Sequence, residues 1–155
     1  MAENIHVAII GAGPAGLFAA EKLAALGYGV VLFNRDIKPG GMAEYGIYPE
    51  KHAIKDGLRR QFNRILTLDQ LHYYGNVYVG EDRCLTIPQI LEWGVPAVLV
   101  ACGAQGTKWL GLPGEELLGV YHAKDVIFFY NRLPPFSTMP ISIGRRVVVV
   151  GAGNT

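Results

Sequence analysis

The sequence is short of cysteine, of charge and of long apolar runs, and each shortage excludes a class of protein. Its two cysteines, Cys84 and Cys102, form no Cys-x-x-Cys pair, which disfavours a redox dithiol or a metal site and predicts reduced, mostly buried thiols. No apolar run is long enough to span a bilayer, and residues 1–4 lack the basic segment of a secretory signal. We therefore expect a cytoplasmic protein with no membrane contact.

Charged residues make up only 17% of the chain and the net charge is +1, which gives no overall attraction to nucleic acid or to a membrane. The four histidines are scattered without the spacing of metal ligands, and no Ser–His–Asp set or carboxylate pair is recognisable. The sequence thus predicts no metal site and leaves the catalytic residues unassigned. Half of the 155 residues are hydrophobic, which is enough for one domain with a sizeable core.

Glycine is plentiful, and its 20 residues lie mostly in short clusters between apolar runs, as in an α/β protein. Residues 5–10 form an apolar run of the kind that is buried on both faces of a parallel sheet. Residues 14–26 follow with helical spacing, and residues 30–33 are a second buried strand. Strand, glycine turn, helix and strand make one βαβ unit.

The rest of the chain continues this alternation. Apolar residues at helical spacing predict an amphipathic helix over residues 52–66, carried by Ile54, Leu58, Phe62 and Ile65. We also expect a helix over residues 124–130 and strands over residues 77–79, 85–87, 97–101 and 146–150. The predicted fold class is α/β: a Rossmann-like domain with a parallel sheet, followed by the start of a second Rossmann-like domain.

A Gly-x-Gly-x-x-Gly pattern follows the first predicted strand and opens the first predicted helix. Gly11 permits the tight turn, Gly13 lets a pyrophosphate approach the backbone, and Gly16 lets the helix pack close to the strand. Pro14 suits the first helical turn, where free N–H groups and the helix dipole favour a phosphate. The pattern predicts a dinucleotide site.

In such a site the second strand ends on an acidic residue that binds the ribose, but this chain has Asn34 there, followed by Arg35. Asparagine can hydrogen-bond a hydroxyl group but offers no carboxylate, and an arginine is what a 2′-phosphate would attract. From the residues alone, FAD and NADP both remain candidates for this first site.

Five further segments resemble, in the same order, flavoproteins that have two dinucleotide-binding domains. They are Pro39-Gly40-Gly41-Met42, Tyr45-Gly46-Ile47-Tyr48-Pro49, and residues 75–80, 111–117 and 130–134. The resemblance covers nearly the whole chain. Within this family the sequence is most similar to the adrenodoxin reductases and their bacterial ferredoxin–NADP reductase relatives, and the small subunit of glutamate synthase is a close second.

The resemblance implies that FAD occupies the first site. Asn34 would lie at the ribose in place of the usual glutamate, Met42 replaces a leucine beside the flavin, and Cys102 replaces a threonine. The residues implied to contact FAD are Gly11, Gly13, Pro14, Ala15, Gly16, Asn34, Arg35, Gly41, Met42, Tyr45, Gly46, Val79, Cys102 and Gly103.

The end of the sequence repeats a pattern from its beginning, an apolar run followed by Gly-Ala-Gly. The resemblance implies that the NADP phosphate loop begins here, with Gly151, Ala152, Gly153, Asn154 and Thr155. The third glycine and its helix lie beyond residue 155, so we expect a fragment that is not catalytically competent alone. The implied organisation is the N-terminal part of an FAD-binding domain in residues 1–103, a crossover in 104–145, and the first strand and truncated loop of an NADP-binding domain in 146–155.

The resemblance further implies an FAD-dependent oxidoreductase that passes electrons from NAD(P)H through FAD to an iron–sulfur protein such as ferredoxin or to a partner subunit. The alternatives are an electron-input subunit like that of glutamate synthase and a nucleotide-binding module without turnover. The predicted helix over residues 52–66 and its start are basic, which indicates either a solvated face or a docking patch for an acidic partner: Lys51, Lys55, Arg59, Arg60 and Arg64.

Overall fold

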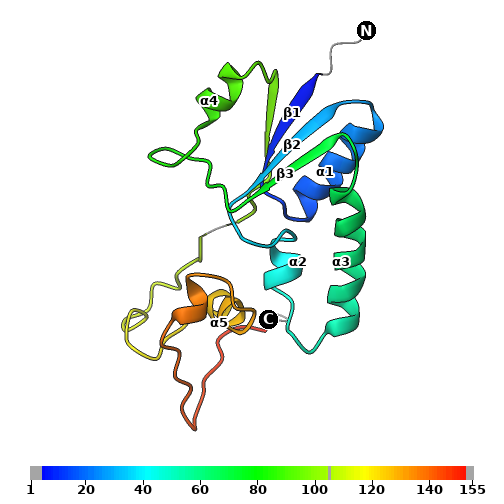
Figure 1. Cartoon of the computed structure of the whole chain (residues 1–155). Coiled ribbons are helices and arrows are strands. Elements are labelled where there is room, and N and C mark those ends of the chain that lie inside the picture. The colour runs from blue at the N-terminus through cyan, green and yellow to red at the C-terminus, as the bar shows by residue number, and fades with distance from the viewer. Residues whose placement is uncertain (1–4, 105, 153–155) are drawn as a thin grey trace.

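A four-stranded parallel sheet forms the centre of the molecule (Figure 1). The computed structural model describes residues 5–104 and 106–152. The strands are β1 (His6–Ile10), β2 (Gly29–Asn34), β3 (Leu71–Gly75) and β4 (Ala97–Val100), in the spatial order β3-β2-β1-β4. The parallel sheet expected from the apolar runs is therefore confirmed.

Apolar side chains alternate between the two faces of the sheet, and each face carries its own core. Ile9 and Leu32 pack with the helices α1 (Pro14–Ala25) and α3 (His52–Leu66) on one face. Ala8, Ile10 and Phe33 point to the other face, where they meet the short helix α4 (Ile87–Glu92). A strand covered on both faces must be apolar at successive positions, which is why β1 and β2 read as unbroken runs.

Among the elements that pair with or pack on the sheet, β3 and α4 were not predicted. The strand β3 pairs with β2, but only Leu71 of its five residues is buried, so its sequence carries no apolar run. Residues 77–79 and 85–87 were expected to form strands; instead they share a single bridge between Val79 and Leu85, and Ile87 begins α4. A capping box between Thr86 and Gln89 and a proline in the first turn start that helix and explain the error.

The remaining elements lie below the sheet in Figure 1. They are the one-turn helix α2 (Met42–Tyr45), within a segment that was expected to be loop, and α5 (Ala123–Tyr130), within one residue of its prediction. A 3₁₀ helix (Phe136–Thr138) follows α5 and packs on it through an edge-to-face contact of Phe128 with Phe136, whose ring centroids are 5.1 Å apart. The described helices include none that is long and apolar enough to cross a membrane.

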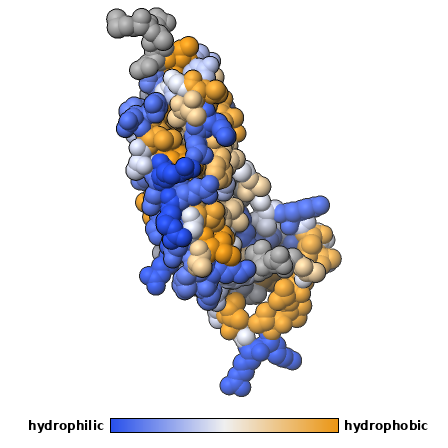
Figure 2. Space-filling view, turned by 90° about the vertical axis from the view of Figure 1, so that its right-hand side faces the viewer, coloured by the Kyte–Doolittle hydropathy of each residue, from blue (hydrophilic) through white to orange (hydrophobic). Residues whose placement is uncertain are grey.

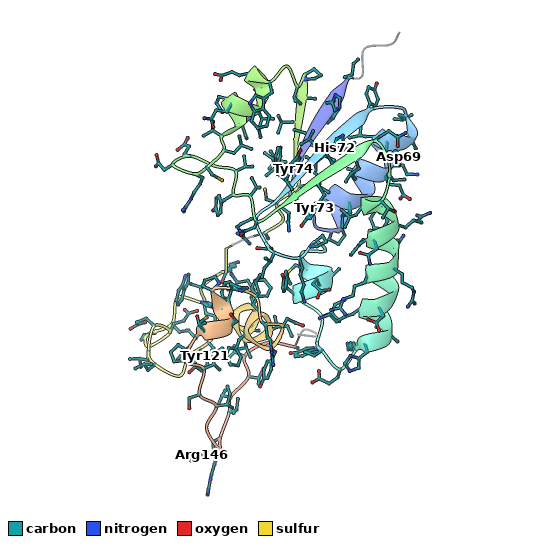
Figure 3. All side chains as sticks on the ribbon, viewed as in Figure 1. Asp69, His72, Tyr73, Tyr74, Tyr121 and Arg146 are labelled. Atoms are coloured by element: carbon teal, nitrogen blue, oxygen red, sulfur yellow. The ribbon has the colours of Figure 1, made fainter. Side chains whose placement is uncertain are left out.

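The predicted strand over residues 146–150 is not formed. These residues pair with none of the four strands, and the exposed fractions of Val147 to Val150 range from 60% to 89%. A parallel strand needs a neighbour for its backbone groups, and the described part of the chain offers none there. Arg146 extends from the lower tip of the molecule (Figure 3).

Candidate functional site

The turn from β1 into α1 has the geometry that its glycines predict. Gly11 has φ of 110°, and a Cβ atom there would lie 2.5 Å from the carbonyl oxygen of Ala101. A Cβ atom on Gly16 would collide with the carbonyl oxygen of Gly11. Gly13, in contrast, faces open space with nothing within 4 Å, so its bare backbone is accessible to a phosphate group.

The position of this turn in the sheet favours ligand binding. β1 pairs with β2 on one side and with β4 on the other, so the connections leaving these strands diverge at the carboxyl end of β1. In an open parallel sheet, ligands bind in the crevice at such a reversal of strand order. Pro14 occupies the first turn of α1, whose first N–H groups have no partners within the helix.

A second glycine turn, Gly40-Gly41, closes against the first. The N–H of Gly40 donates a hydrogen bond of 2.7 Å to the carbonyl oxygen of Ala12. Gly41 has φ of 50°, and a Cβ atom there would lie 3.0 Å from the Cα of Gly13. The structure therefore brings together the two glycine clusters that the sequence singled out, although Ala12 and Gly40 were not on the predicted list of ligands.

Asn34, at the end of β2, is 6% exposed and lies beside the same turn. Its Oδ1 accepts a hydrogen bond of 3.2 Å from the N–H of Ala12. Its Nδ2 donates to the carbonyl oxygens of Asp36 and Lys38, at 2.8 and 3.1 Å. The side chain at the ribose position thus holds backbone of the site on two sides.

The segment that follows Gly41 was expected to border the flavin. Met42 is 54% exposed, and Gly46 ends α2. Tyr45, however, is buried, and its hydroxyl oxygen accepts a hydrogen bond of 3.2 Å from the N–H of Lys38. Burial raises the pKa of the Tyr45 phenol, so we assign this side chain to holding the loop.

Two polar clamps attach α2 to its surroundings. Glu44 is nearly buried and forms a two-pronged ion pair with Arg59 of α3, at 2.9 and 2.7 Å. This hydrogen-bonded pairing lowers the pKa of the Glu44 carboxyl. Asn131 donates from Nδ2 to the carbonyl oxygens of Tyr45 and Ile47, both at 2.9 Å.

Lys55 completes the second clamp. It is 6% exposed, and its ammonium group donates a hydrogen bond of 2.6 Å to Oδ1 of Asn131. Burial lowers the pKa of Lys55. Residue 131 lies in one of the segments that carry the family resemblance, but no periodicity pairs it with residues 45–55.

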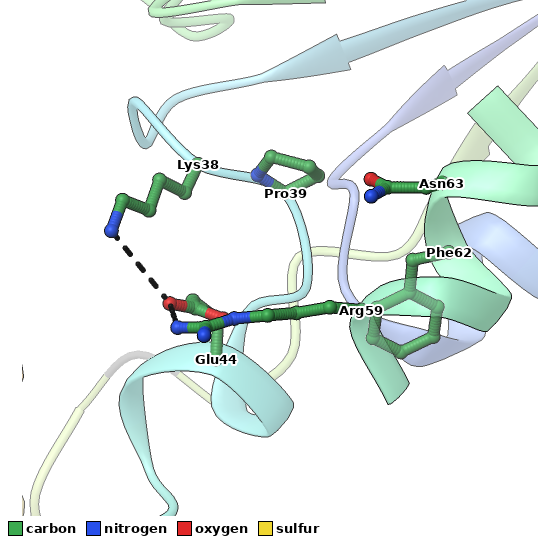
Figure 4. A pocket seen from close by; sticks show the side chains of 6 residues that line it. All are labelled: Lys38, Pro39, Glu44, Arg59, Phe62 and Asn63. Atoms are coloured by element: carbon green, nitrogen blue, oxygen red, sulfur yellow. Dashed lines mark hydrogen bonds and ion pairs between the residues drawn. The ribbon is translucent and has the colours of Figure 1, made fainter. Parts of the chain in front are cut away.

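A pocket of about 330 Å³ opens between residues 38–44 and α3 (Figure 4). Lys38 and Arg59 converge on the carboxylate of Glu44, with the Lys38 ammonium 3.9 Å away. Arg59 also pairs with Asp56 at 3.3 Å, so two carboxylates balance the two cations and the pocket offers an anion little unpaired charge. Its lining residues are Lys38, Pro39, Glu44, Arg59, Phe62 and Asn63.

The basic residues of the α3 region do not act as one patch. Lys55 is buried, Arg59 pairs with Glu44, and Arg64 donates to Glu21 of α1 at 2.6 Å. Lys51 and Arg60 are exposed. Figure 2 shows that the α3 side is largely hydrophilic, whereas hydrophobic side chains gather lower down.

The remaining predicted FAD contacts lie at the strand ends. Cys102 and Gly103 follow β4, where the Cys102 thiol is 3.5 Å from the carbonyl oxygen of Ile10. Both cysteines are exposed, so the expectation of buried thiols was wrong: each lies beyond a strand or in a loop rather than in the core. Val79 is partly buried against the α4-side core. Within the described residues, no three His, Cys, Asp or Glu side chains form a metal-binding group.

Only the first two residues of the predicted NADP loop are described. Gly151 and Ala152 follow the unpaired segment and are exposed, and nothing lies within 4 Å of where a Cβ atom on Gly151 would be. Gly153, Asn154 and Thr155 lie outside the described residues. Arg35 is exposed and pairs with Asp36 through Nε at 3.0 Å.

Comparison with known proteins agrees with the resemblance. The chain is 33% identical over 97% of its length to NADPH:adrenodoxin oxidoreductase of Arabidopsis thaliana, a mitochondrial protein of which it covers 31%. It is 34% identical to NADPH-ferredoxin reductase FprA of Mycobacterium tuberculosis, over 96% of the chain and 34% of the relative. It therefore spans about a third of the length of these relatives.

The fold is similar as well. The structure of Mycobacterium tuberculosis FprA in complex with NADPH superposes with a TM-score of 0.79 at 31% identity, over 88% of this chain and 31% of that one. The family model of the pyridine nucleotide-disulphide oxidoreductases matches residues 5–155. With its parallel sheet, its glycine turn at the strand reversal and this match, the chain belongs to the pyridine nucleotide-disulphide oxidoreductase family.

Proposed function

We propose that the chain is the FAD-binding front part of an oxidoreductase that takes electrons from NADPH. The observation that carries the proposal is the open Gly13 backbone, set at the strand reversal and faced by the Gly40-Gly41 arm. The relatives named NADPH:adrenodoxin oxidoreductase and NADPH-ferredoxin reductase support the choice of cofactor chemistry.

The residues present fit an FAD molecule at this site. Gly13 leaves room for the pyrophosphate, and the N–H groups at the start of α1 and the helix dipole favour its charge. Gly41, Met42 and Gly46 would border the flavin ring, and Cys102 and Gly103 would lie at the other side. When bound, the flavin supplies hydride acceptance and onward electron transfer, while the protein supplies position and electrostatics.

The division of the chain follows from this proposal. Residues 1–103 would form the N-terminal part of the FAD-binding domain, and residues 104–145 would cross over to the next domain. Residues 146–155 would begin the NADP-binding domain, with Gly151 to Thr155 at its phosphate loop. The unpaired, apolar Val147 to Val150 segment supports this, because its side chains are those of a strand that is buried on both faces.

An iron–sulfur protein such as ferredoxin is the proposed electron acceptor, in line with the names of the relatives. A cytoplasmic location stays a prediction, and the Arabidopsis relative is named as mitochondrial. Acceptor assays separate the candidates: NADPH-driven reduction of ferredoxin supports the proposal, whereas glutamate formation from glutamine and 2-oxoglutarate supports the glutamate-synthase alternative. A protein that binds neither FAD nor NADPH would instead be a module of another kind.

The central test is Gly13→Ala in the full natural chain. The added methyl group meets no protein atom, so the thermal stability of the FAD-free protein should stay unchanged. FAD affinity should fall roughly 10- to 100-fold, because the methyl group occupies the space of the pyrophosphate. Gly57→Ala is the matched control, since a Cβ atom there meets only the Arg60 side chain at 4.0 Å. Unchanged FAD affinity in Gly13→Ala would contradict the proposal.

A further inference from the structure

Asn34 differs from the carboxylate expected at its position in that its side chain donates hydrogen bonds as well as accepting them. An ionised carboxylate can only accept hydrogen bonds, whereas an amide also donates two hydrogens. Both hydrogens of the Asn34 amide face backbone carbonyl oxygens, those of Asp36 and Lys38. A longer contact of 3.4 Å reaches the hydroxyl of Tyr73 on β3.

The orientation of this amide is fixed by its partners. Oδ1 faces the N–H of Ala12, a donor, and Nδ2 faces two carbonyl oxygens, which are acceptors. Exchanging oxygen and nitrogen would place like groups against each other at every one of these contacts. The donors of Asn34 are therefore committed to the protein, and only one lone pair of Oδ1 is left for a ligand.

These contacts join both sides of the site. The Ala12 peptide lies in the first glycine turn, donates to Asn34, and through its carbonyl oxygen accepts from Gly40. Lys38 accepts from Asn34 through its carbonyl oxygen and donates through its N–H to Tyr45. Asn34 thus lies between the first glycine turn, which would hold the pyrophosphate, and residues 36–38, which lead to the segment that would border the flavin.

We propose that Asn34 is a positioning residue that holds the loop 35–38 and the Ala12 peptide in the shape that receives FAD, and that it acts through its two donated hydrogen bonds. The inference rests on the proposed FAD site and deepens it. A carboxylate at this position would oppose both carbonyl oxygens: that of Lys38 would lose the Asn34 donor, and that of Asp36 would keep only the longer bond of 3.4 Å from the N–H of Asn76.

The test is Asn34→Asp in the full natural chain, with FAD affinity measured by flavin fluorescence at pH 8 and pH 5. At pH 8 the introduced carboxylate cannot donate, and affinity should fall roughly 10- to 100-fold relative to the unaltered protein. Burial and the facing carbonyl oxygens raise the pKa of the introduced carboxyl, so its protonated, donating form gains population as the pH falls from 8 to 5. A protonated carboxyl donates one hydrogen where the amide donates two, so part of the loss should then be recovered.

The neighbouring groups do not account for such a change. The charged or titratable side chains around Asn34 are Arg35, Asp36 and Lys38 from its own loop, Tyr45 from α2 and Tyr73 from β3. None of them is a histidine, the side chain whose charge ordinarily changes between pH 5 and pH 8. Asn63→Asp, an identical chemical change at an exposed position of α3, is the matched control and should show no recovery at pH 5.

Two measurements complete the design. Limited proteolysis of the FAD-free protein should cut within residues 35–41 faster in Asn34→Asp at pH 8 than in the Asn63→Asp control. If Asn34→Asp does not fold, Asn34→Ser, which keeps one donor, should weaken FAD binding about equally at both pH values.

Tighter or unchanged FAD binding by Asn34→Asp at pH 8 would overturn the inference, because it would make Asn34 a plain ribose acceptor. A loss at pH 8 that is not recovered at pH 5 would also overturn it, as would full affinity in Asn34→Ser. Failure of the unaltered protein to bind FAD would instead refute the proposed function, so the two failures are distinguishable.

Discussion

The first Gly-Ala-Gly segment and the described part of the second share a positive φ at their first glycine, 110° at Gly11 and 126° at Gly151, but differ in their surroundings. Gly11 to Gly13 follow a strand that is paired on both edges, and Gly40 closes over the turn. Gly151 and Ala152 follow four valines that are more than half exposed and pair with no described strand. The glycines of such a fingerprint therefore allow a tight turn, but contacts from neighbouring strands and loops are needed to form it.

The largest expected difference between the two segments lies at their first glycines. Gly11→Ala should destabilise the folded chain by roughly 3 kcal/mol or more, because φ is positive and the Cβ atom would strike the Ala101 carbonyl oxygen. Gly151 also has a positive φ, of 126°, but a Cβ atom there meets nothing within 4 Å, so Gly151→Ala should cost only about 1 kcal/mol. Urea unfolding of both variants of the 155-residue chain measures this, and equal costs would break the comparison.

Residues 42–47, which follow the Gly40-Gly41 turn, are held in place by Asn131. Asn131→Ala removes the acceptor of the buried Lys55 and the donor to Tyr45 and Ile47, and should cost about 2–3 kcal/mol. Amide hydrogen exchange should accelerate in residues 42–47 and in α5 together. Asn63→Ala, at an exposed position, is the control. Faster exchange in only one of the two segments would show that Asn131 does not connect them.

Replacing a valine by threonine in each segment compares the burial of β2 with that of residues 147–150. Val30→Thr in β2 places a polar group at a fully buried position and should cost about 1–3 kcal/mol. Val148→Thr, where the side chain is 89% exposed, should stay within about 0.5 kcal/mol. Thermal unfolding of the 155-residue chain gives both values. A large cost for Val148→Thr would mean that the second segment is packed after all.

The smallest effect is electrostatic. Arg59 lowers the pKa of the Glu44 carboxyl below its ordinary 4.5, so the pair stabilises the fold above that pH, and its contribution is lost as the pH falls through the lowered value. Glu44→Gln should cost about 1 kcal/mol at pH 7, because Arg59 is half exposed, and progressively less as the pH falls below 4.5. Glu50→Gln, an exposed glutamate, should be neutral over the same pH range. A cost for Glu44→Gln that does not decrease as the pH falls would show that the Arg59 pairing is not its source.

Sequence periodicity predicted the elements that have a buried apolar face. β1, α1, β2, α3 and α5 were found within one or two residues because their apolar residues repeat at the spacing of the element. β3 and α4 were missed because an edge strand and a short capped helix need few buried residues. The strand predicted over residues 146–150 is not formed: these residues are an apolar run, but they have no partner among the described strands, which a sequence pattern does not reveal.

The candidate site was predictable to the extent that it is made of glycine. Positive φ values and close backbone contacts restrict Gly11 and Gly41 to that residue, so their spacing carries the signal. The contacts of Asn34 with Ala12 and of Asn131 with Tyr45 join residues 22 and 86 positions apart. No local pattern encodes such pairs, and the buried Lys55 was expected on a solvated or docking face for the same reason.

The hydrogen bonds from Asn131 to Tyr45 and Ile47 also impose an order on biosynthesis. Residues 42–47 leave the ribosome long before residue 131, so the arm over the glycine turn waits, with these carbonyl oxygens hydrated, until more than 80 further residues have been made. Domains fold as units during synthesis, and here residues 45 and 47 can gain these two bonds only after Asn131 has emerged. A nascent chain halted before α5 would carry the whole first fingerprint and still lack the side chain that holds residues 42–47.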